Sequence, residues 1–439
     1  MPDVNAGNTA WILVSAAMVL LMTPGLALFY GGMTRAKSVV NMMMKSLAAL
    51  GAVSVLWVLF GFSVAASEGN AFMGGFSEVG LRGVLTTIDA DGLPVSVGVA
   101  FGLMFAIITV ALVSGAVADR MKFNAWLIFS IVWVSVVYFP VAYWVWGGGF
   151  VQQMGVLDFA GGTAVHVNAG AAALALALVV GRRLGWKNGN FAPHNLPMVM
   201  LGTGLLWFGW FGFNAGSALA ADGVAGLALL NTQVATGAAI LAWLAVDRVR
   251  GNRPSVLGAC SGVIAGLVAI TPAAAYVEPL GALALGVVAG AVCPLAIALK
   301  HRLGYDDALD VVGLHLVAGA LGSILLGVFA MPQLSDGSAG LLYGGSASLL
   351  GIQTAAVLAV GGFSFVVALV IGLALKLTTG VRVASEVELA GIDTAEHAES
   401  AYDLPANGNG FADHDEETPA SAEKTEDAAQ RGELVSADK

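Results

Sequence analysis

Two histidines occupy equivalent places in a repeated motif. His166 begins HVNAGAAAL and His315 begins HLVAGALGS, so both follow the pattern His, apolar, any residue, Ala-Gly-Ala. Both lie inside long apolar runs, where a titratable side chain is costly and therefore indicates a functional interior such as a pore. An imidazole donates from one ring nitrogen and accepts at the other, so a pair can relay a proton or guide a small polar molecule. Two alternatives stay open: neutral imidazoles that only satisfy neighbouring helices, and axial ligation of a haem, which the lack of nearby basic groups disfavours.

Other side chains with suitable chemistry fall near the same end of their apolar runs. Asp158, in LDFAGGTAVH, is placed either to cap the following helix through the amides of Gly161, Gly162 and Thr163 or to attract a cation. Ser217, in FNAGSA, offers a hydroxyl acceptor. Aromatic rings suit cation–π capture of a small cation, although an interfacial aromatic belt is an alternative. The candidate rings are Phe101, Phe105, Trp146, Trp210 and Phe213.

The elements that must position these residues are membrane-spanning helices. The chain has 439 residues, 58% of them hydrophobic and only 11% charged, whereas a soluble protein has roughly 25% charged residues. Apolar runs of about 20 residues indicate spanning helices, and they do not alternate as the strands of a membrane barrel do. We predict eleven spans, at residues 10–31, 39–66, 94–117, 123–143, 163–181, 196–214, 225–246, 256–272, 279–299, 311–330 and 347–377.

The histidine motifs lie in the fifth and tenth spans, which predicts two five-helix halves followed by one extra helix. Two such halves insert with opposite orientation, and inverted repeats place the substrate site near the membrane midplane, between the halves. We therefore expect an all-α polytopic membrane protein in which His166 and His315 occupy equivalent positions and face the bundle interior or a pore.

The basic residues predict the orientation of the chain. Of the 19 Lys and Arg residues, all except Arg82 fall on one side of this topology, which the positive-inside rule assigns to the cytoplasm. The N-terminus is then outside and the C-terminus inside, and no signal peptide is evident. The multi-pass location expected is the plasma membrane.

Three segments follow from composition: a transmembrane domain at 1–380, a cytoplasmic segment at 381–403, and a polar, acidic tail at 404–439 that we expect to be disordered. Residues 381–439 carry a net charge of −11 and the rest of the chain +1, which argues against a nucleic-acid partner. Cys260 and Cys293 lie in apolar runs and are expected to be buried. We expect neither a cofactor nor an enzyme, because the sequence offers no nucleophile beside a base, no metal-ligand cluster and no phosphate loop.

Three motifs closely resemble the ammonium transporter family, Amt/Mep/Rh, and its bacterial and archaeal Amt branch in particular. They are ALFYGGMTRAKSVVNMM from Ala27, DFAGGTAVHVNAG from Asp158, and GWFGFNAGSA from Gly209, and the likeness runs from about residue 8 to 402. The resemblance implies a homotrimer in the lipid bilayer, with one narrow hydrophobic pore for ammonium or ammonia in each subunit. The segment from Gly380 to Tyr402 resembles a cytoplasmic tail at which PII-type signalling proteins block the pore exit.

The resemblance also assigns roles to residues. Phe105, Trp146 and Ser217 match an outer site that recruits ammonium, and Asp158 matches the family's essential outer carboxylate. Phe105 and Phe213 match a stacked pair that closes the pore, and His166 and His315 match the twin imidazoles that line it. Gly102 departs from the pattern, because bacterial relatives commonly have glutamine there.

The expected activity is electrogenic ammonium uptake: deprotonation outside, passage of ammonia past the histidines, and a separate relay of the proton. Transfer of an intact cation into a medium of low dielectric would cost on the order of 20 kcal/mol. The rival interpretations are an electroneutral ammonia or carbon dioxide channel and an ammonium sensor, although the tail is too short and too polar for a fused output domain.

Overall fold

The computed structural model describes residues 3–187 and 191–402, and within these ranges the chain is helical, with isolated β-bridges and no strand. Met1–Ala401 forms one compact unit. The predicted tail at 404–439 lies outside the described residues. A helix satisfies all its backbone groups internally, which is why apolar runs of this length adopt it in a membrane.

Within the described residues, ten helical segments are long and apolar enough to cross a membrane, and they correspond to ten of the predicted spans. The predicted span at 256–272 is the exception, because α11 (Val256–Ile270) has 15 residues and then gives way to turns. The ten segments are Ala6–Met33, Val39–Ala66, Val95–Val117, Phe123–Gln153, Gly162–Val180, Leu196–Gly216, Gly223–Val249, Pro279–Leu303, Val312–Phe329 and Ala347–Thr378.

Within these segments the helices have the following bounds. The first half contains α1 (Ala6–Met33), α2 (Val39–Leu56), η1 (Trp57–Gly61), α3 (Phe62–Ala66), α4 (Val95–Val113), η3 (Ser114–Val117), α5 (Phe123–Trp133), η4 (Val134–Tyr138), α6 (Phe139–Trp146), α7 (Phe150–Gln153), η5 (Gly162–Val167) and α8 (Asn168–Val180). The remainder contains α9 (Leu196–Gly216), α10 (Gly223–Val249), α12 (Pro279–Leu303), η6 (Val312–Val317), α13 (Ala318–Phe329) and α14 (Ala347–Thr378). Short helices η2 (Val79–Leu81) and η7 (Leu341–Tyr343) lie in loops, and α15 (Ser385–Ala390) and α16 (Ile392–His397) follow α14.

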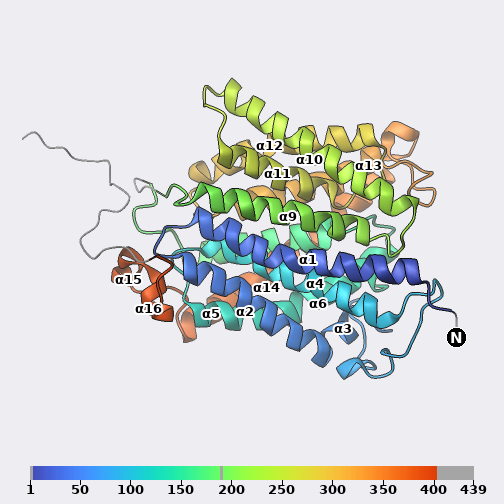
Figure 1. Ribbon diagram of the computed structural model, residues 1–439, viewed down its shortest axis with the longest axis horizontal. Coiled ribbons are helices and arrows are strands. Elements are labelled where there is room, and N and C mark those ends of the chain that lie inside the picture. Colours follow the sequence, from blue (N-terminus) through green and yellow to red (C-terminus); the bar gives the residue numbers. More distant parts are fainter. Residues whose placement is uncertain (1–2, 188–190, 403–439) are drawn as a thin grey trace, which may run out of the picture. The chain divides into compact units, whose positions relative to one another are not determined.

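The first helices of the two predicted halves, α1 and α9, lie side by side (Figure 1). They run in opposite directions, because Gly32 near the end of α1 meets Val199 near the start of α9, while Ser15 meets Gly216 at the far end of α9. Glycine allows this closeness: a Cβ at Gly202 would lie 2.3 Å from the backbone nitrogen of Phe29. Small residues at such contacts are typical of membrane helix pairs. The antiparallel pair is the arrangement expected of inverted halves.

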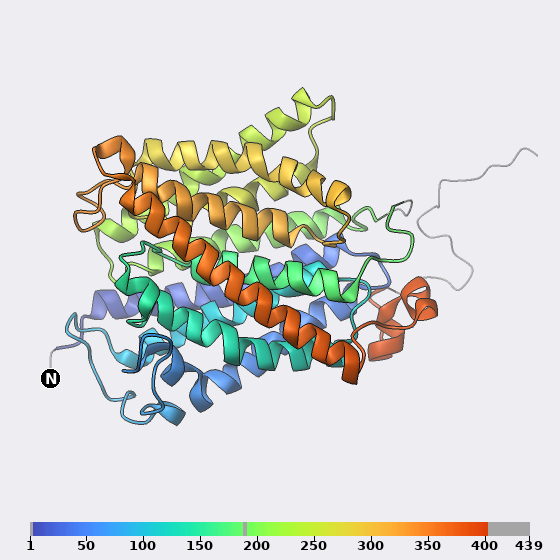
Figure 2. The same cartoon turned by 180° about the vertical axis from the view of Figure 1, so that it is seen from behind.

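Helix α14 covers the other side of the bundle, where it packs against α8 and α13 (Figure 2). Ser364 anchors it at mid-length by donating a hydrogen bond of 2.8 Å to the backbone oxygen of Asn168. Gln353 holds its first half by donating to the backbone oxygens of Leu157 and Ser323 at 2.8 and 2.9 Å. Helix α14, which is the eleventh predicted span, is therefore hydrogen-bonded to both of the segments that carry the motif histidines.

The predicted basic loops meet at one end of the bundle, which we call the basic end. Arg183 forms ion pairs there with Asp119 and Asp306, at 3.2 and 2.9 Å, and the Arg35 guanidinium lies 3.6 Å from Asp119. Helices α15 and α16 lie at this end, away from the N-terminus (Figure 1). The loops rich in Lys and Arg therefore lie at the same end of the bundle, as the charge pattern predicted.

The segment after α14 is tied to the basic end by carboxylates. Glu388 accepts the backbone N–H of Leu184 at 2.7 Å and pairs with Arg382 at 2.7 Å. Asp393 accepts the backbone N–H groups of Val40 and Asn41, at 3.0 and 2.8 Å, and so caps α2 from outside that helix. Burial raises the pKa of Asp393, and these hydrogen bonds lower it in part.

Candidate functional site

The two motif histidines face each other in the interior. Their Nδ1 atoms are 3.3 Å apart, and their rings are 5.3 Å apart at an angle of 26°. His166 and His315 are 1% and 3% exposed, and the Nε2 atom of His166 has no hydrogen-bond partner among the described residues. One imidazole must donate and the other accept across the short contact, so the pair is oriented like a link in a proton relay.

Both histidines lie in π-helical turns that start their spans. His166 is in η5 and His315 is in η6, and each turn continues into a regular helix, α8 or α13. A π-helical turn is uncommon and is found mostly at functional sites, because it changes the direction of its side chains at a cost in backbone geometry. The repeated motif therefore folds into a repeated local structure.

Glycines bring these two segments into contact reciprocally. A Cβ at Gly170, four residues after His166, would lie 2.4 Å from the backbone nitrogen of Leu316. A Cβ at Gly319, four residues after His315, would lie 2.9 Å from the oxygen of Gly162 and 3.0 Å from the Cβ of His166. Each histidine-bearing segment thus packs directly against the glycine of the other segment's Ala-Gly-Ala motif. This close contact sets the distance between the two imidazoles.

Asp158 holds the start of η5. Its carboxylate accepts backbone N–H groups from Gly161, Gly162, Thr163 and Ala164 at 2.7 to 3.1 Å. Burial raises the pKa of this carboxyl, while the four hydrogen bonds lower it in part. The predicted capping bonds are present, and both oxygens are occupied by them. Asp158 therefore holds the start of the segment that carries His166.

Aromatic rings form a continuous series of contacts toward His166. Phe105 and Phe213 are stacked with centroids 4.1 Å apart and planes 19° apart. Phe213 lies 6.0 Å from the His166 ring, and Trp210 stacks on that ring at 5.3 Å. Trp210 also donates to the hydroxyl of Thr271 at 2.9 Å, which fixes the indole. Its place beside the histidine differs from the expectation that it helps to capture a cation farther out.

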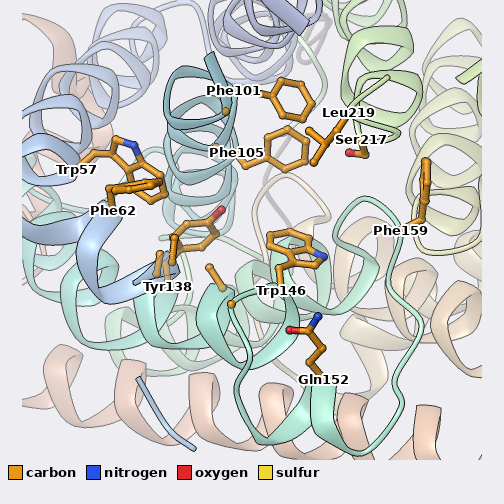
Figure 3. A pocket seen from close by; sticks show the side chains of 16 residues that line it. Trp57, Phe62, Phe101, Phe105, Tyr138, Trp146, Gln152, Phe159, Ser217 and Leu219 are labelled. Carbon is orange, nitrogen blue, oxygen red and sulfur yellow. The ribbon is translucent and has the colours of Figure 1, made fainter. Parts of the chain in front are cut away.

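A cavity of about 470 Å³ opens on the other side of Phe105, at the end of the bundle opposite the basic end. Phe101, Phe105, Trp146 and Ser217 line it together (Figure 3). The Ser217 hydroxyl donates to the backbone oxygen of Phe213 at 2.8 Å, which leaves its oxygen lone pairs free to accept. Trp146 donates to the backbone oxygen of Asp158 at 2.9 Å, so the indole and the cap are coupled.

The structure thus brings the predicted site residues into one region. Phe101 shares the cavity wall with Phe105, and Phe213 is stacked on Phe105 beneath the cavity. Trp57, Phe62 and Tyr138 extend that wall, and sequence reasoning missed them (Figure 3). Gly102 faces Trp57, because a Cβ there would lie 3.2 Å from the indole. Trp57 therefore fills space that a longer side chain at 102 would need.

Among residues 3–187 and 191–402, no three His, Cys, Asp or Glu side chains come together as a metal site. Cys260 and Cys293 are free and buried, as predicted. The site therefore consists of an aromatic mouth, a stacked pair of rings and two imidazoles in contact, an arrangement suited to a small cation outside and a small neutral molecule inside.

Comparison with known proteins gives the class of this site. Residues 10–402 match the model of the Ammonium Transporter Family. The ammonium transporter of Mycobacterium tuberculosis is 52% identical over 92% of this chain and 91% of its own, and that of Bacillus subtilis is 47% identical over 90% and 98%. The crystal structure of Candida albicans Mep2 aligns with a TM-score of 0.82 at 34% identity, over 88% of each chain.

The chain therefore belongs to the ammonium transporter family, and it is a multi-pass membrane protein. A structure titled "Sensor Amt Protein" is also similar, with a TM-score of 0.84 at 28% identity, covering 89% of this chain and 98% of that one.

Proposed function

We propose that this protein transports ammonium across the plasma membrane electrogenically, splitting the cation into ammonia and a proton that cross separately. The observation that carries the proposal is the buried contact between His166 and His315, 3.3 Å from Nδ1 to Nδ1, behind a stacked aromatic pair. The family membership supports ammonium as the substrate.

The outer cavity is the place to recruit the cation. Phe101, Phe105 and Trp146 offer ring faces, and each cation–π contact contributes about 0.5–2 kcal/mol. Ser217 accepts an N–H of the cation, and the buried charge of Asp158 favours a cation nearby. Phe105 belongs to both the cavity wall and the stacked pair, so it connects recruitment to passage.

Passage beyond the rings favours a neutral molecule. An intact cation entering a medium of low dielectric pays on the order of 20 kcal/mol in desolvation, and two aromatic faces return only a small part of it. Deprotonation at the stacked pair removes this cost, and ammonia then meets imidazoles that offer both a donor and an acceptor. The proton follows through the same pair, whose contact is short enough for transfer.

Separate passage of the proton lets the membrane potential drive uptake. One positive charge is worth about 2.3 kcal/mol per 100 mV. That energy supports roughly fifty-fold accumulation, whereas neutral ammonia alone would only equilibrate.

The oligomeric state and the regulatory partner of the protein are also part of this proposal. We propose that the protein works as a homotrimer with one pore in each subunit. We also propose that a PII-type signalling protein binds the basic end, where α15 and α16 are docked beside the loop after α8. The cytoplasmic side is then the basic end, in accord with the positive-inside rule.

Replacing both histidines tests the proposal. In the variant His166→Leu/His315→Leu, the ammonium-evoked current of reconstituted protein is expected to vanish because no relay for the proton remains. The variant His301→Leu is the matched control, since His301 is exposed at the end of α12 and stacks on Trp186, outside the pore. An undiminished current in the double variant would refute the proposal.

A further inference from the structure

A second aspartate has the same position relative to its histidine as Asp158. Asp158 precedes His166 by eight residues, and Asp307 precedes His315 by eight. Asp307 accepts the backbone N–H of Val312, the first residue of η6, with its Oδ2 at 2.7 Å. The two aspartates therefore cap the two histidine-bearing segments from opposite ends of the bundle, Asp307 at the basic end.

The two carboxylates differ in how far they are satisfied. Four backbone N–H groups occupy both oxygens of Asp158. Asp307 is 1% exposed, and its Oδ1 has no hydrogen-bond partner among the described residues. An unpartnered oxygen on a buried carboxylate is costly, and a proton on that oxygen removes the charge that makes it so.

The groups around Asp307 allow it to change its protonation. Burial raises the pKa of Asp307 to about 6; Lys300 of α12 lowers it, the neighbouring Asp310 raises it, and the Val312 and Val311 amides lower it. The Lys300 ammonium donates to the backbone oxygen of Asp307 at 2.9 Å and to the carboxylate of Asp310. Two tyrosines, Tyr305 on the same loop and Tyr30 on α1, complete the titratable groups on which the charge of Asp307 acts.

A cavity of about 300 Å³ lies at the basic end, next to the loop that carries Asp307. The following residues of that loop, Leu309 and Asp310, line it together with Arg183 and Lys300. Arg183 is already paired with Asp306 and Asp119, and Lys300 with Asp310. Among the described residues at this end, Asp119 and Asp307 each keep a buried carboxylate oxygen without a hydrogen-bond partner. The Asp119 oxygen lies 3.6 Å from the Arg35 guanidinium, whereas Asp307 belongs to the loop that lines the cavity.

We propose that Asp307 is the inner proton donor of transport, the group that returns a proton to ammonia at the basic end. This inference rests on the proposed function. The step balances: the O–H bond of the Asp307 carboxylic acid breaks, an N–H bond forms on ammonia, and ammonium and the Asp307 carboxylate result. The proton relayed through His166 and His315 then restores the acid, so no other reactant is needed.

The two repeated aspartates then have different roles. Asp158 stays fully hydrogen-bonded and positions His166, whereas Asp307 positions His315 with one oxygen and holds the proton with the other.

Infrared difference spectroscopy on the reconstituted full chain tests the proposal. In the wild type we expect the carbonyl band of a protonated carboxylic acid, shifted by deuteration, with a titration midpoint of about 6. The variant Asp307→Asn should lose this band, while its amide oxygen still accepts the Val312 N–H and keeps the cap. The variant Asp310→Asn is the matched control, since it removes the same charge beside the same lysine and should retain the band.

The ammonium-evoked current of the same samples completes the test. Asp307→Asn should reduce it by about a hundredfold, the lower range for loss of a positioned proton donor, and Asp310→Asn should reduce it much less. A band that persists in Asp307→Asn, or a wild-type current in that variant, overturns the proposal. A wild type without any current overturns the proposed function and the transfer step with it. The infrared titration separates that result from a failure of Asp307 alone.

Discussion

The contact between the two histidine segments leads to a quantitative prediction for Gly170→Ala. The new Cβ would lie 2.4 Å from the backbone nitrogen of Leu316 and 2.7 Å from its Cα, and backbone atoms cannot rotate away. Restoring an ordinary contact of 3.4 Å requires the segments to separate by about 1 Å. The distance between the imidazole Nδ1 atoms would then rise from 3.3 Å to beyond the range of a hydrogen bond.

Two effects of this separation are measurable. Overpacking of this kind typically costs about 1–3 kcal/mol, which should lower the thermal unfolding temperature of the purified protein by several degrees. Misplacing reacting groups by about 1 Å reduces rates roughly a hundredfold, so the ammonium-evoked current should fall by that order while the protein still folds.

The control for this prediction is Gly204→Ala. Gly204 lies inside α9, and a Cβ there would meet nothing within 4 Å, so the substitution tests the loss of a helical glycine alone. It should leave the current unchanged and stabilise the helix slightly. A Gly170→Ala protein with the current and stability of the wild type would refute the reasoning that the glycine sets the imidazole contact.

Three further predictions concern the rings, the cap and the basic end. Phe213→Ala removes one ring of the stack with Phe105, so methylammonium current should rise relative to ammonium current, and an unchanged ratio would speak against a gate. Asp158→Ala leaves four backbone N–H groups without their acceptor and should destabilise the protein by about 2 kcal/mol or more in thermal unfolding, while Asp158→Asn should lose less. The Arg183 guanidinium, together with Arg120, outweighs the effect of burial and lowers the pKa of Asp306, so the ionised carboxylate stabilises the fold above its ordinary pKa. The stability that the ionised Asp306 contributes should disappear as pH falls through the lowered pKa. The variant Arg183→Gln lacks this contribution, so its unfolding should not show the same loss of stability at acid pH. Identical acid-unfolding profiles of the variant and the wild type would contradict this prediction.

Much of the architecture could be predicted because its causes are local in the sequence. Apolar length gave ten of the helical spans, and the basic residues indicated which loops meet at one end. The repeated motif indicated His166 and His315 as equivalent interior residues, since few reasons exist to keep an imidazole inside an apolar run, and the structure adds their direct contact. The resemblance to a family gave the roles of the surrounding aromatic residues.

The details that were missed depend on packing between distant segments. Trp57 and Tyr138 belong to π-helical turns, and no periodicity in the sequence reveals such a turn or the face it presents. Trp210 was expected at the mouth, but the hydroxyl of Thr271 holds it against His166. Asp307 was overlooked among neighbouring acids, because only the spatial contacts show that its Oδ1 lacks a partner while Asp306 and Asp310 are paired.

The most direct test of electrogenic ammonium transport is the transient current of the reconstituted wild-type protein on a solid-supported membrane. Ammonium is increased in a step at constant pH and potassium concentration, and a pH probe inside the vesicles reports ammonia entry. The account predicts a saturable current with ammonium, a smaller one with methylammonium and none with potassium. Ammonia entry without a current would contradict it and identify an electroneutral channel, and the absence of both signals would favour a sensor.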